Sequence, residues 1–280
     1  MSALAMQLAA LRRQAGVEAP RTTPVARSPV PEELRRLLGV RARAEARTFS
    51  LDRELPGSEI APGLRYVERR LDWPEAPETL DASFANFGAI ARTQVLQFDT
   101  ETTGLSGGTG TRAFMIGAAD WPDRQLRVRQ LFLSTMAAET TMLQAFAQWL
   151  QPDTVLVSYN GRCYDAPLLA TRYRLARMGN PLVSLRHLDL LFPVRRRYRG
   201  VWENCRLATI ERQLLGVIRE DDLPGSEAPQ AWRDYLRGGS SGNLRRVVDH
   251  NDQDLRSLSA LLVRMVRDQS VESPRAPRPI

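Results

Sequence analysis

The chain contains no lysine, and all 39 of its basic residues are arginine. This absence excludes a P-loop, whose lysine contacts the phosphates, and a Schiff-base enzyme, which needs a lysine amine. The glycine-rich stretch 104–111 is therefore not a P-loop, despite its composition.

Cysteine and histidine are scarce, with two of each in 280 residues. Cys163 and Cys205 form no Cys-x-x-Cys pair, so we expect a reducing compartment, with the cytoplasm as the default. His187 and His250 are too few to favour a structural zinc site. No apolar run approaches membrane-spanning length, and the first 17 residues lack the basic start of a signal peptide. We expect no membrane association.

The charge that is present is strongly positive, with a net charge of +7 and a pI of about 10.2. This excess suits a polyanionic partner, either nucleic acid or an anionic membrane surface. An arginine-rich composition without any such partner is the alternative reading.

The chain divides by composition into four parts. Residues 1–50 are rich in Ala, Arg and Pro and predict a flexible segment with short helices at 4–13 and 32–38. Residues 51–90, with a strand at 64–69, predict a lead-in packed on a main domain at 91–268. Residues 269–280 predict a disordered tail.

The main domain alternates strand and helix patterns. Strands are predicted at 94–100, 112–119, 125–133 and 155–158, the second and third joined by a hairpin near 122–123. Helices are predicted at 136–150, 166–177, 186–192, 204–215, 228–237 and 242–268. The order indicates an α/β fold with a mixed sheet, three antiparallel strands plus parallel ones, flanked by helices. Ligands on such sheets gather at the C-terminal strand ends.

Asp99 and Glu101 stand at such a strand end, after the apolar run 95–98. Side chains alternate along a strand, so these two carboxylates share one face at about 7 Å spacing. Carboxylates this close repel unless a cation lies between them. Magnesium is held by one or two carboxylates together with substrate phosphates.

Asp165 follows the strand at 155–158 and an Asn-Gly turn, and it precedes Pro167 at a helix start. Such an aspartate is commonly a helix cap, and local pattern alone favours that role. His250 and Asp254 are i and i+4 on the last helix and share its core-facing side. A buried His–Asp pair is the simpler explanation for these two. Asp252 lies roughly 200° around the helix from Asp254 and is expected to face solvent.

Taken together, four carboxylates (Asp99, Glu101, Asp165 and Asp254) could meet at one sheet edge. Four acids meeting in one place would be unstable without cations, and two divalent ions about 4 Å apart are typical of phosphoryl-transfer nucleases.

These motifs resemble the DEDD (DnaQ-like) superfamily of 3′→5′ exonucleases, which has a ribonuclease H-like fold. The resemblance rests on Asp-x-Glu-Thr-Thr-Gly at 99–104, Asn160-Gly161-x-x-Tyr164-Asp165, and His250-x-x-x-Asp254. The sequence is more closely similar to the bacterial YprB-type domain, with its Gly-rich extension at 103–111 and the segments at 187–191, 205–207 and 220–225. His250 stands at the four-residue spacing of the tyrosine subclass. The resemblance covers about residues 60–268.

The resemblance implies a fold and a mechanism. Asp99, Glu101, Asp165 and Asp254 would hold two Mg²⁺ or Mn²⁺ ions, and His250 would orient or deprotonate the attacking water. The substrate would be the end of a single-stranded DNA or RNA.

Several further residues are candidates for binding that substrate. The run Arg195-Arg196-Arg197-Tyr198-Arg199 with Trp202 combines arginines for phosphates with rings for stacking, although a solvated helix end explains it equally well. The terminal nucleotide pocket would involve Thr102, Tyr159, Asn160 and Tyr164. His187 and Asp189 would support the site or cap a helix.

Three functions compete. The first is a metal-dependent 3′–5′ exonuclease. The second is a nucleic-acid-binding module without catalysis, which predicts salt-sensitive binding and no turnover. The third is a structure-selective endonuclease on the same fold, which the Asp-x-Glu spacing disfavours.

Overall fold

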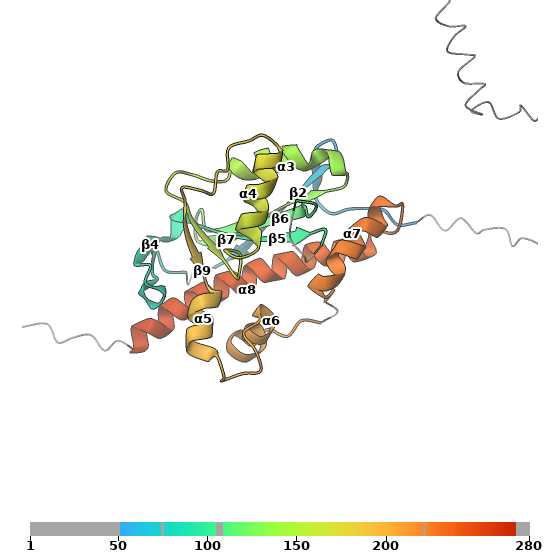
Figure 1. The fold of residues 1–280 in the computed structure, drawn as a ribbon. Coiled ribbons are helices and arrows are strands. Elements are labelled where there is room, and N and C mark those ends of the chain that lie inside the picture. The colour runs from blue at the N-terminus through green and yellow to red at the C-terminus, as the bar shows by residue number, and fades with distance from the viewer. Residues whose placement is uncertain (1–50, 74–75, 105–108, 221, 273–280) are drawn as a thin grey trace, which may run out of the picture. The chain divides into compact units, whose positions relative to one another are not determined.

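The computed structural model describes residues 51–73, 76–104, 109–220 and 222–272, and the side chains up to 269. It has α/β architecture, with a central sheet of seven strands in the order β1-β2-β7-β6-β5-β8-β9 (Figure 1). The predicted features of residues 1–50 lie outside the described residues. No helix within the described ranges is both long and apolar enough to cross a membrane.

Strand β6 (Ala113–Asp120) pairs antiparallel with β5 (Val95–Thr102) on one side and with β7 (Gln125–Leu133) on the other, which confirms the three predicted strands and their hairpin. β2 (Leu64–Asp72) pairs with β7 along its whole length, and β1 (Ser58–Ala61) lies at the edge. β8 (Val155–Ser158) adds parallel to β5. A separate pair, β3 (Thr79–Asp81) and β4 (Ala89–Ala91), completes the strands of the described chain.

One helical prediction is wrong. Arg186–Asp189 forms strand β9, parallel to β8, and the following helix α5 runs from Leu191 to Tyr198. Four residues are too few to show a helical or strand period, so the pairing partner decides the conformation. Because β9 extends the sheet, Asp189 lies at the same C-terminal edge as the residues that follow β8.

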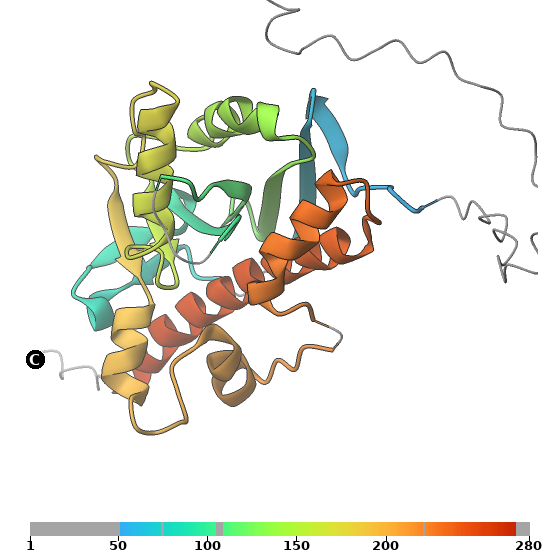
Figure 2. The ribbon, with the colours of Figure 1, turned by 45° about the vertical axis from the view of Figure 1, so that its right-hand side comes forward.

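Helices cover both faces of the sheet (Figures 1 and 2). On one face, α3 (Glu139–Ala147) and α4 (Asp165–Leu175) pack Phe146 and Tyr173 with Phe98 of β5. On the other face, α8 (Gly242–Glu272) crosses the sheet. Leu255 and neighbouring residues of this helix belong to a second cluster of buried hydrophobic side chains.

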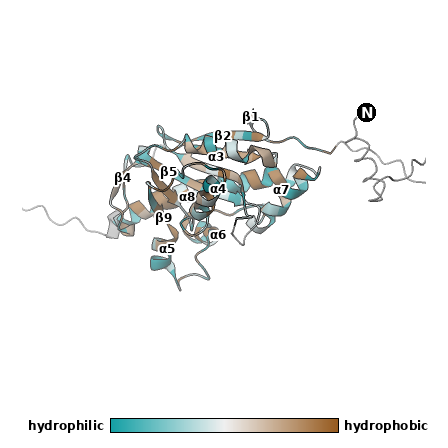
Figure 3. Ribbon diagram, turned by 45° about the horizontal axis from the view of Figure 1, so that its top comes forward, coloured by the Kyte–Doolittle hydropathy of each residue, from teal (hydrophilic) through white to brown (hydrophobic). Residues whose placement is uncertain are grey.

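Shorter helices complete the α8 side. They are α6 (Leu207–Ile210), continued by a π-helical turn at Glu211–Leu215, and α7 (Ala228–Leu236). Hydrophilic and hydrophobic residues alternate along α7 (Figure 3). The helix buries Trp232 and Tyr235. Helix α8 extends to Glu272, beyond its predicted end at 268, and residues 273–280 of the predicted tail lie outside the described chain.

Asp252 does not face solvent as predicted. It is 4% exposed and pairs with Arg69 of β2 at 3.1 Å and with Arg256 at 2.7 Å. The apolar period of α8 does not reveal this, because Arg69 belongs to a distant strand, β2.

Candidate active site

The alternation of β5 sends its polar side chains to opposite faces of the sheet. The amide of Asn251 on α8 donates to Asp99 Oδ2 at 2.9 Å, so Asp99 faces α8. Thr100, the next residue, donates its hydroxyl to Asp165 Oδ1 at the start of α4. Glu101, two residues after Asp99, is 7% exposed and lies within the electrostatic influence of Asp254. The C-terminal end of β5 is thus where α4 and α8 both approach.

The sequence around Asp165 favours a helix-capping role over a role in binding metal. Asp165 is the first residue of α4, and the preceding capping position is Tyr164, which makes no side-chain cap bond. The carboxylate of Asp165 instead accepts the Thr100 hydroxyl. Burial raises the pKa of Asp165 to about 6, although the Thr100 bond opposes the rise.

The carboxylates of the site also repel one another, and this repulsion contributes to their raised pKa values. Burial, followed by the charges of Asp165, Asp254 and Glu101, raises the pKa of Asp99 well above its usual value. Burial and the charges of Asp254 and Asp165 do the same for Glu101. The structure therefore brings all four predicted acids into one electrostatic environment.

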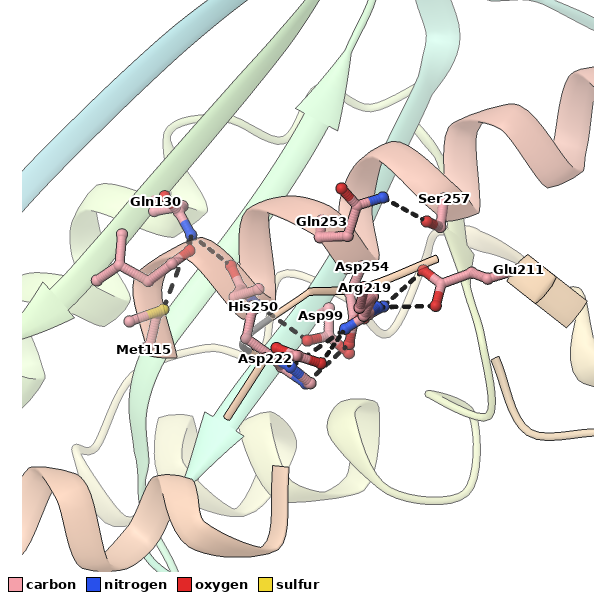
Figure 4. Close-up of polar contacts among 12 residues, drawn as sticks. Asp99, Met115, Gln130, Glu211, Arg219, Asp222, His250, Gln253, Asp254 and Ser257 are labelled. Atoms are coloured by element: carbon pink, nitrogen blue, oxygen red, sulfur yellow. Dashed lines mark hydrogen bonds and ion pairs between the residues drawn. The ribbon is translucent and has the colours of Figure 1, made fainter. Parts of the chain in front are cut away.

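The four acids do not form a preorganised set of metal ligands. Across the described ranges, no three His, Cys, Asp or Glu side chains form a group that could hold a metal ion. The carboxylate of Asp254 is instead bonded to the guanidinium of Arg219 (Figure 4). Carboxylate oxygens are nevertheless the ligands that Mg²⁺ and Mn²⁺ prefer, so the chemistry of the donor set fits such ions.

His250 has a closer partner than the predicted one. Its Nδ1 lies 2.7 Å from Asp222 Oδ1, whereas its Nε2 is 3.6 Å from Asp254 Oδ2. Burial acts to raise the pKa of Asp222, but the hydrogen bond with His250 and the charge of Arg219 outweigh it and lower that pKa. Asp222 therefore orients the ring with Nε2 on the side of Asp254 (Figure 4).

A cavity of about 430 Å³ opens beside the acids. It is lined by Asp99, Asp165 and the four residues predicted for a nucleotide pocket: Thr102, Tyr159, Asn160 and Tyr164. Tyr164 is 63% exposed at its edge, and the Tyr159 hydroxyl is bonded to the carbonyl of Cys205 at 2.5 Å.

Asp189 fixes the turn that carries Asn160, and it also accepts a hydrogen bond from the backbone at the start of helix α5. Its buried carboxylate accepts the backbone N–H of Asn160 at 2.7 Å and of Arg162 at 3.0 Å, which fixes the turn after β8. It also accepts the N–H of Leu191 at 3.1 Å at the start of α5. His187 bonds instead to the Ser158 hydroxyl through Nε2, at 2.8 Å.

The arginines of the run 195–199 fall into two groups, one that lines a cavity and one that pairs with other parts of the protein. Arg195, Arg199 and Trp202 line a second cavity of about 690 Å³, which shares Tyr159 and Asn160 with the first. Arg196 donates to the carbonyl of Phe84, and Arg197 lies 3.8 Å from Asp268. Neither Arg196 nor Arg197 is among the residues lining these two cavities.

Sequence reasoning missed Asn251, Arg219 and Glu211. Asn251 is fully buried and joins Asp99 to Gln130 of β7, whose amide donates to Asn251 Oδ1 at 2.9 Å. The signal for Asn251 in the sequence was a polar amide on an otherwise apolar face of the last helix. Arg219 lies in an irregular segment, where no hydrophobic period applies, and Glu211 begins the π-helical turn, whose pattern does not reveal its distant partner.

The match to a family model agrees with this architecture. A family model described as RNase_H superfamily (RNase_H_2) matches residues 96–266, and the chain belongs to this family. The chain is 35% identical over 177 residues to the uncharacterized protein YprB of Bacillus subtilis (strain 168). That match covers 63% of this chain and 43% of YprB, so the chain spans less than half of that relative.

Among solved structures, the chain is similar to the family B DNA polymerase from the hyperthermophilic archaeon Pyrobaculum calidifontis. The TM-score is 0.48 at 15% identity, over 64% of this chain and 24% of the polymerase. Membership of the ribonuclease H superfamily supports a nuclease-like function.

Proposed function

We propose that the protein is a 3′–5′ exonuclease that depends on two Mg²⁺ or Mn²⁺ ions and acts on the end of single-stranded DNA or RNA. The observation that carries this proposal is the shared electrostatic environment of Asp99, Glu101, Asp165 and Asp254, in which Asp99 and Glu101 have strongly raised pKa values. A cluster of buried carboxylates that disfavour one another's ionisation is matched to divalent cations.

The four carboxylates would hold the ions. When bound, such ions supply the charge stabilisation that a phosphodiester transition state needs. Asn251 holds Asp99, and Thr100 holds Asp165, so two of the four carboxylates are oriented by neutral donors that an incoming cation does not repel.

His250 acts as the general base in this proposal. Asp222 binds Nδ1, which leaves Nε2 on the Asp254 side to accept a proton from the attacking water. The ring needs no further rotation, because Asp222 already fixes its orientation.

The first cavity, which is lined by Thr102, Tyr159, Asn160 and Tyr164, would receive the terminal nucleotide. The second cavity shares Tyr159 and Asn160, so the strand would continue toward Arg195, Arg199 and Trp202. Arginine forks bind phosphates there, and Trp202 offers an aromatic face.

The test uses single-stranded DNA and RNA oligonucleotides labelled at either end, incubated with the full chain and Mn²⁺. Stepwise shortening from the 3′ end, abolished in Asp99→Asn, is the expected result. Binding without degradation under every metal would instead identify a binding module. Cleavage of a circular single strand would identify an endonuclease.

A further inference from the structure

Arg219 is the one side chain in the described ranges that joins Asp254 to a second, fully buried acid. Its Nη2 bonds to Asp254 and, at 2.6 Å, to Glu211 Oε1, and its Nε lies 2.8 Å from Glu211 Oε2 (Figure 4). Its Nη1 lies 3.1 Å from both Asp222 Oδ2 and His250 Nδ1. A single guanidinium thus contacts the last acid of the site, the base and the residue that orients the base.

Glu211 fixes this guanidinium in place. Glu211 is 1% exposed and receives two donors of the Arg219 fork, so the pairing is bidentate. A buried bidentate pair of this kind is costly to break, because separation would leave Glu211 charged and alone. The pair with Glu211 therefore opposes movement of Arg219 away from Asp254.

The charge of Arg219 acts on the same carboxylates that would bind ions. Asp254 accepts a hydrogen bond from the guanidinium, and the charge of Arg219 also opposes the rise in the pKa of Glu101 that burial and the neighbouring acids cause. A fixed positive charge a few ångströms from an incoming dication repels it, and in a partly buried site this repulsion is only weakly screened.

We propose that Arg219 is a resident cation of the carboxylate site: it stabilises the ion-free protein by neutralising Asp254, and it lowers the affinity of the site for divalent ions. This inference rests on the proposed function, because it takes the same acids as ion ligands. Glu211 limits the effect, because it shares the charge of the guanidinium.

The probe is Mn²⁺ alone, titrated calorimetrically into the full chain at constant pH without nucleic acid. Arg219→Gln should bind Mn²⁺ at least about tenfold more tightly than the unmodified protein, because one like charge has been removed. Arg212→Gln is the matched control: Arg212 lies in the adjacent π-helical turn and pairs with exposed Glu203, and its loss should leave Mn²⁺ affinity unchanged.

Thermal unfolding gives a second readout. In EDTA, Arg219→Gln should unfold at a lower temperature than the unmodified protein, because the acids are no longer neutralised. Saturating Mn²⁺ should raise its midpoint by more than it raises that of the unmodified protein, since the ion replaces the missing cation.

Glu211→Gln keeps the test decisive if Arg219→Gln does not fold. It leaves Arg219 present but removes the acid that shares its charge, so Mn²⁺ should bind more weakly than to the unmodified protein. Equal or weaker Mn²⁺ binding by Arg219→Gln, or tighter binding by Glu211→Gln, would overturn the inference and leave the proposed function standing. Absence of Mn²⁺ binding by every variant, with or without oligonucleotide, would overturn both.

Discussion

The side-chain amide of Asn251 donates to Asp99 Oδ2 at 2.9 Å and thereby joins the last helix to the strand that carries the first carboxylate. Gln130 completes the connection from β7, because its amide bonds to both Asn251 Oδ1 and the carbonyl of Val248. The orientation of Asp99 thus depends on a buried polar chain that spans two strands and one helix.

Asn251→Ala should therefore lower both stability and activity. It removes the donor to Asp99 and leaves the Gln130 amide with one acceptor fewer, at a cost of about 1–3 kcal/mol in the free energy of unfolding. Urea denaturation in EDTA measures the first effect, and Mn²⁺-dependent oligonucleotide degradation measures the second. Gln253→Ala on the same helix is the control, because Gln253 bonds to Ser257 and takes no part in the hydrogen-bond network of Asn251. Equal losses in both variants would show that Asn251 has no special role.

Gly117 permits this connection by having no side chain. A Cβ at this position would lie 2.1 Å from Asn251 Oδ1 and 2.7 Å from Leu255 Cδ1. Gly117→Ala should thus push α8 away from β6 and destabilise the fold by about 1–3 kcal/mol, as overpacking does elsewhere. Gly179→Ala, whose Cβ would meet nothing within 4 Å, should unfold at almost the same urea concentration as the unmodified protein. A midpoint for Gly117→Ala equal to that of Gly179→Ala would contradict this account.

The sequence was sufficient for the fold class and for the shared face of Asp99 and Glu101, because a period of two along β5 is a local property. It was insufficient for β9, whose conformation comes from its neighbour β8. It also failed for Asp252, whose carboxylate pairs with Arg69 of the distant strand β2. The partners of the site, Arg219 and Asn251, are set by contacts between segments far apart in the chain, and no local pattern encodes such contacts.

Asp165 should destabilise the ion-free protein at neutral pH. Its folded-state pKa is raised to about 6 from an ordinary value of 3.8, so the folded protein binds a proton more readily than the unfolded chain does. The resulting penalty is present above pH 6 and disappears as the pH falls below 4. In EDTA at pH 8, Asp165→Asn should therefore be more stable than the unmodified protein by about 3 kcal/mol.

The pH dependence separates this effect from a simple packing change. The advantage of Asp165→Asn, measured by urea denaturation, should shrink steadily between pH 6 and pH 4. An advantage of constant size across that range would mean that ionisation of Asp165 is not its cause. Asp153→Asn, at an exposed carboxylate that accepts from Gln94, serves as the control.

His187 should act in the opposite direction. Burial lowers its pKa to about 4, so the unfolded chain binds a proton between pH 6.5 and 4 while the folded protein does not. Stability therefore falls as the pH drops through this window, by up to about 3 kcal/mol from this residue. His187→Gln keeps a polar partner for Ser158 and should lose this part of the pH dependence. Identical stability profiles for the two proteins from pH 7 to pH 4 would refute the assignment.

The second cavity predicts which arginines in α5 and directly after it bind nucleic acid. Arg195 and Arg199 line the second cavity, whereas Arg196 is bonded to the carbonyl of Phe84. Arg195→Ala and Arg199→Ala should each weaken binding of a single-stranded oligonucleotide several-fold and reduce the slope of log K against log[salt] by about 0.7, the loss expected for one phosphate contact. Fluorescence anisotropy in Ca²⁺ or EDTA, at four or more salt concentrations, measures both quantities. Arg196→Ala removes the same charge from the same helix and should leave the slope close to that of the unmodified protein. A slope reduced equally in all three variants would mean that the helix attracts nucleic acid by its net charge, with no defined track along the second cavity.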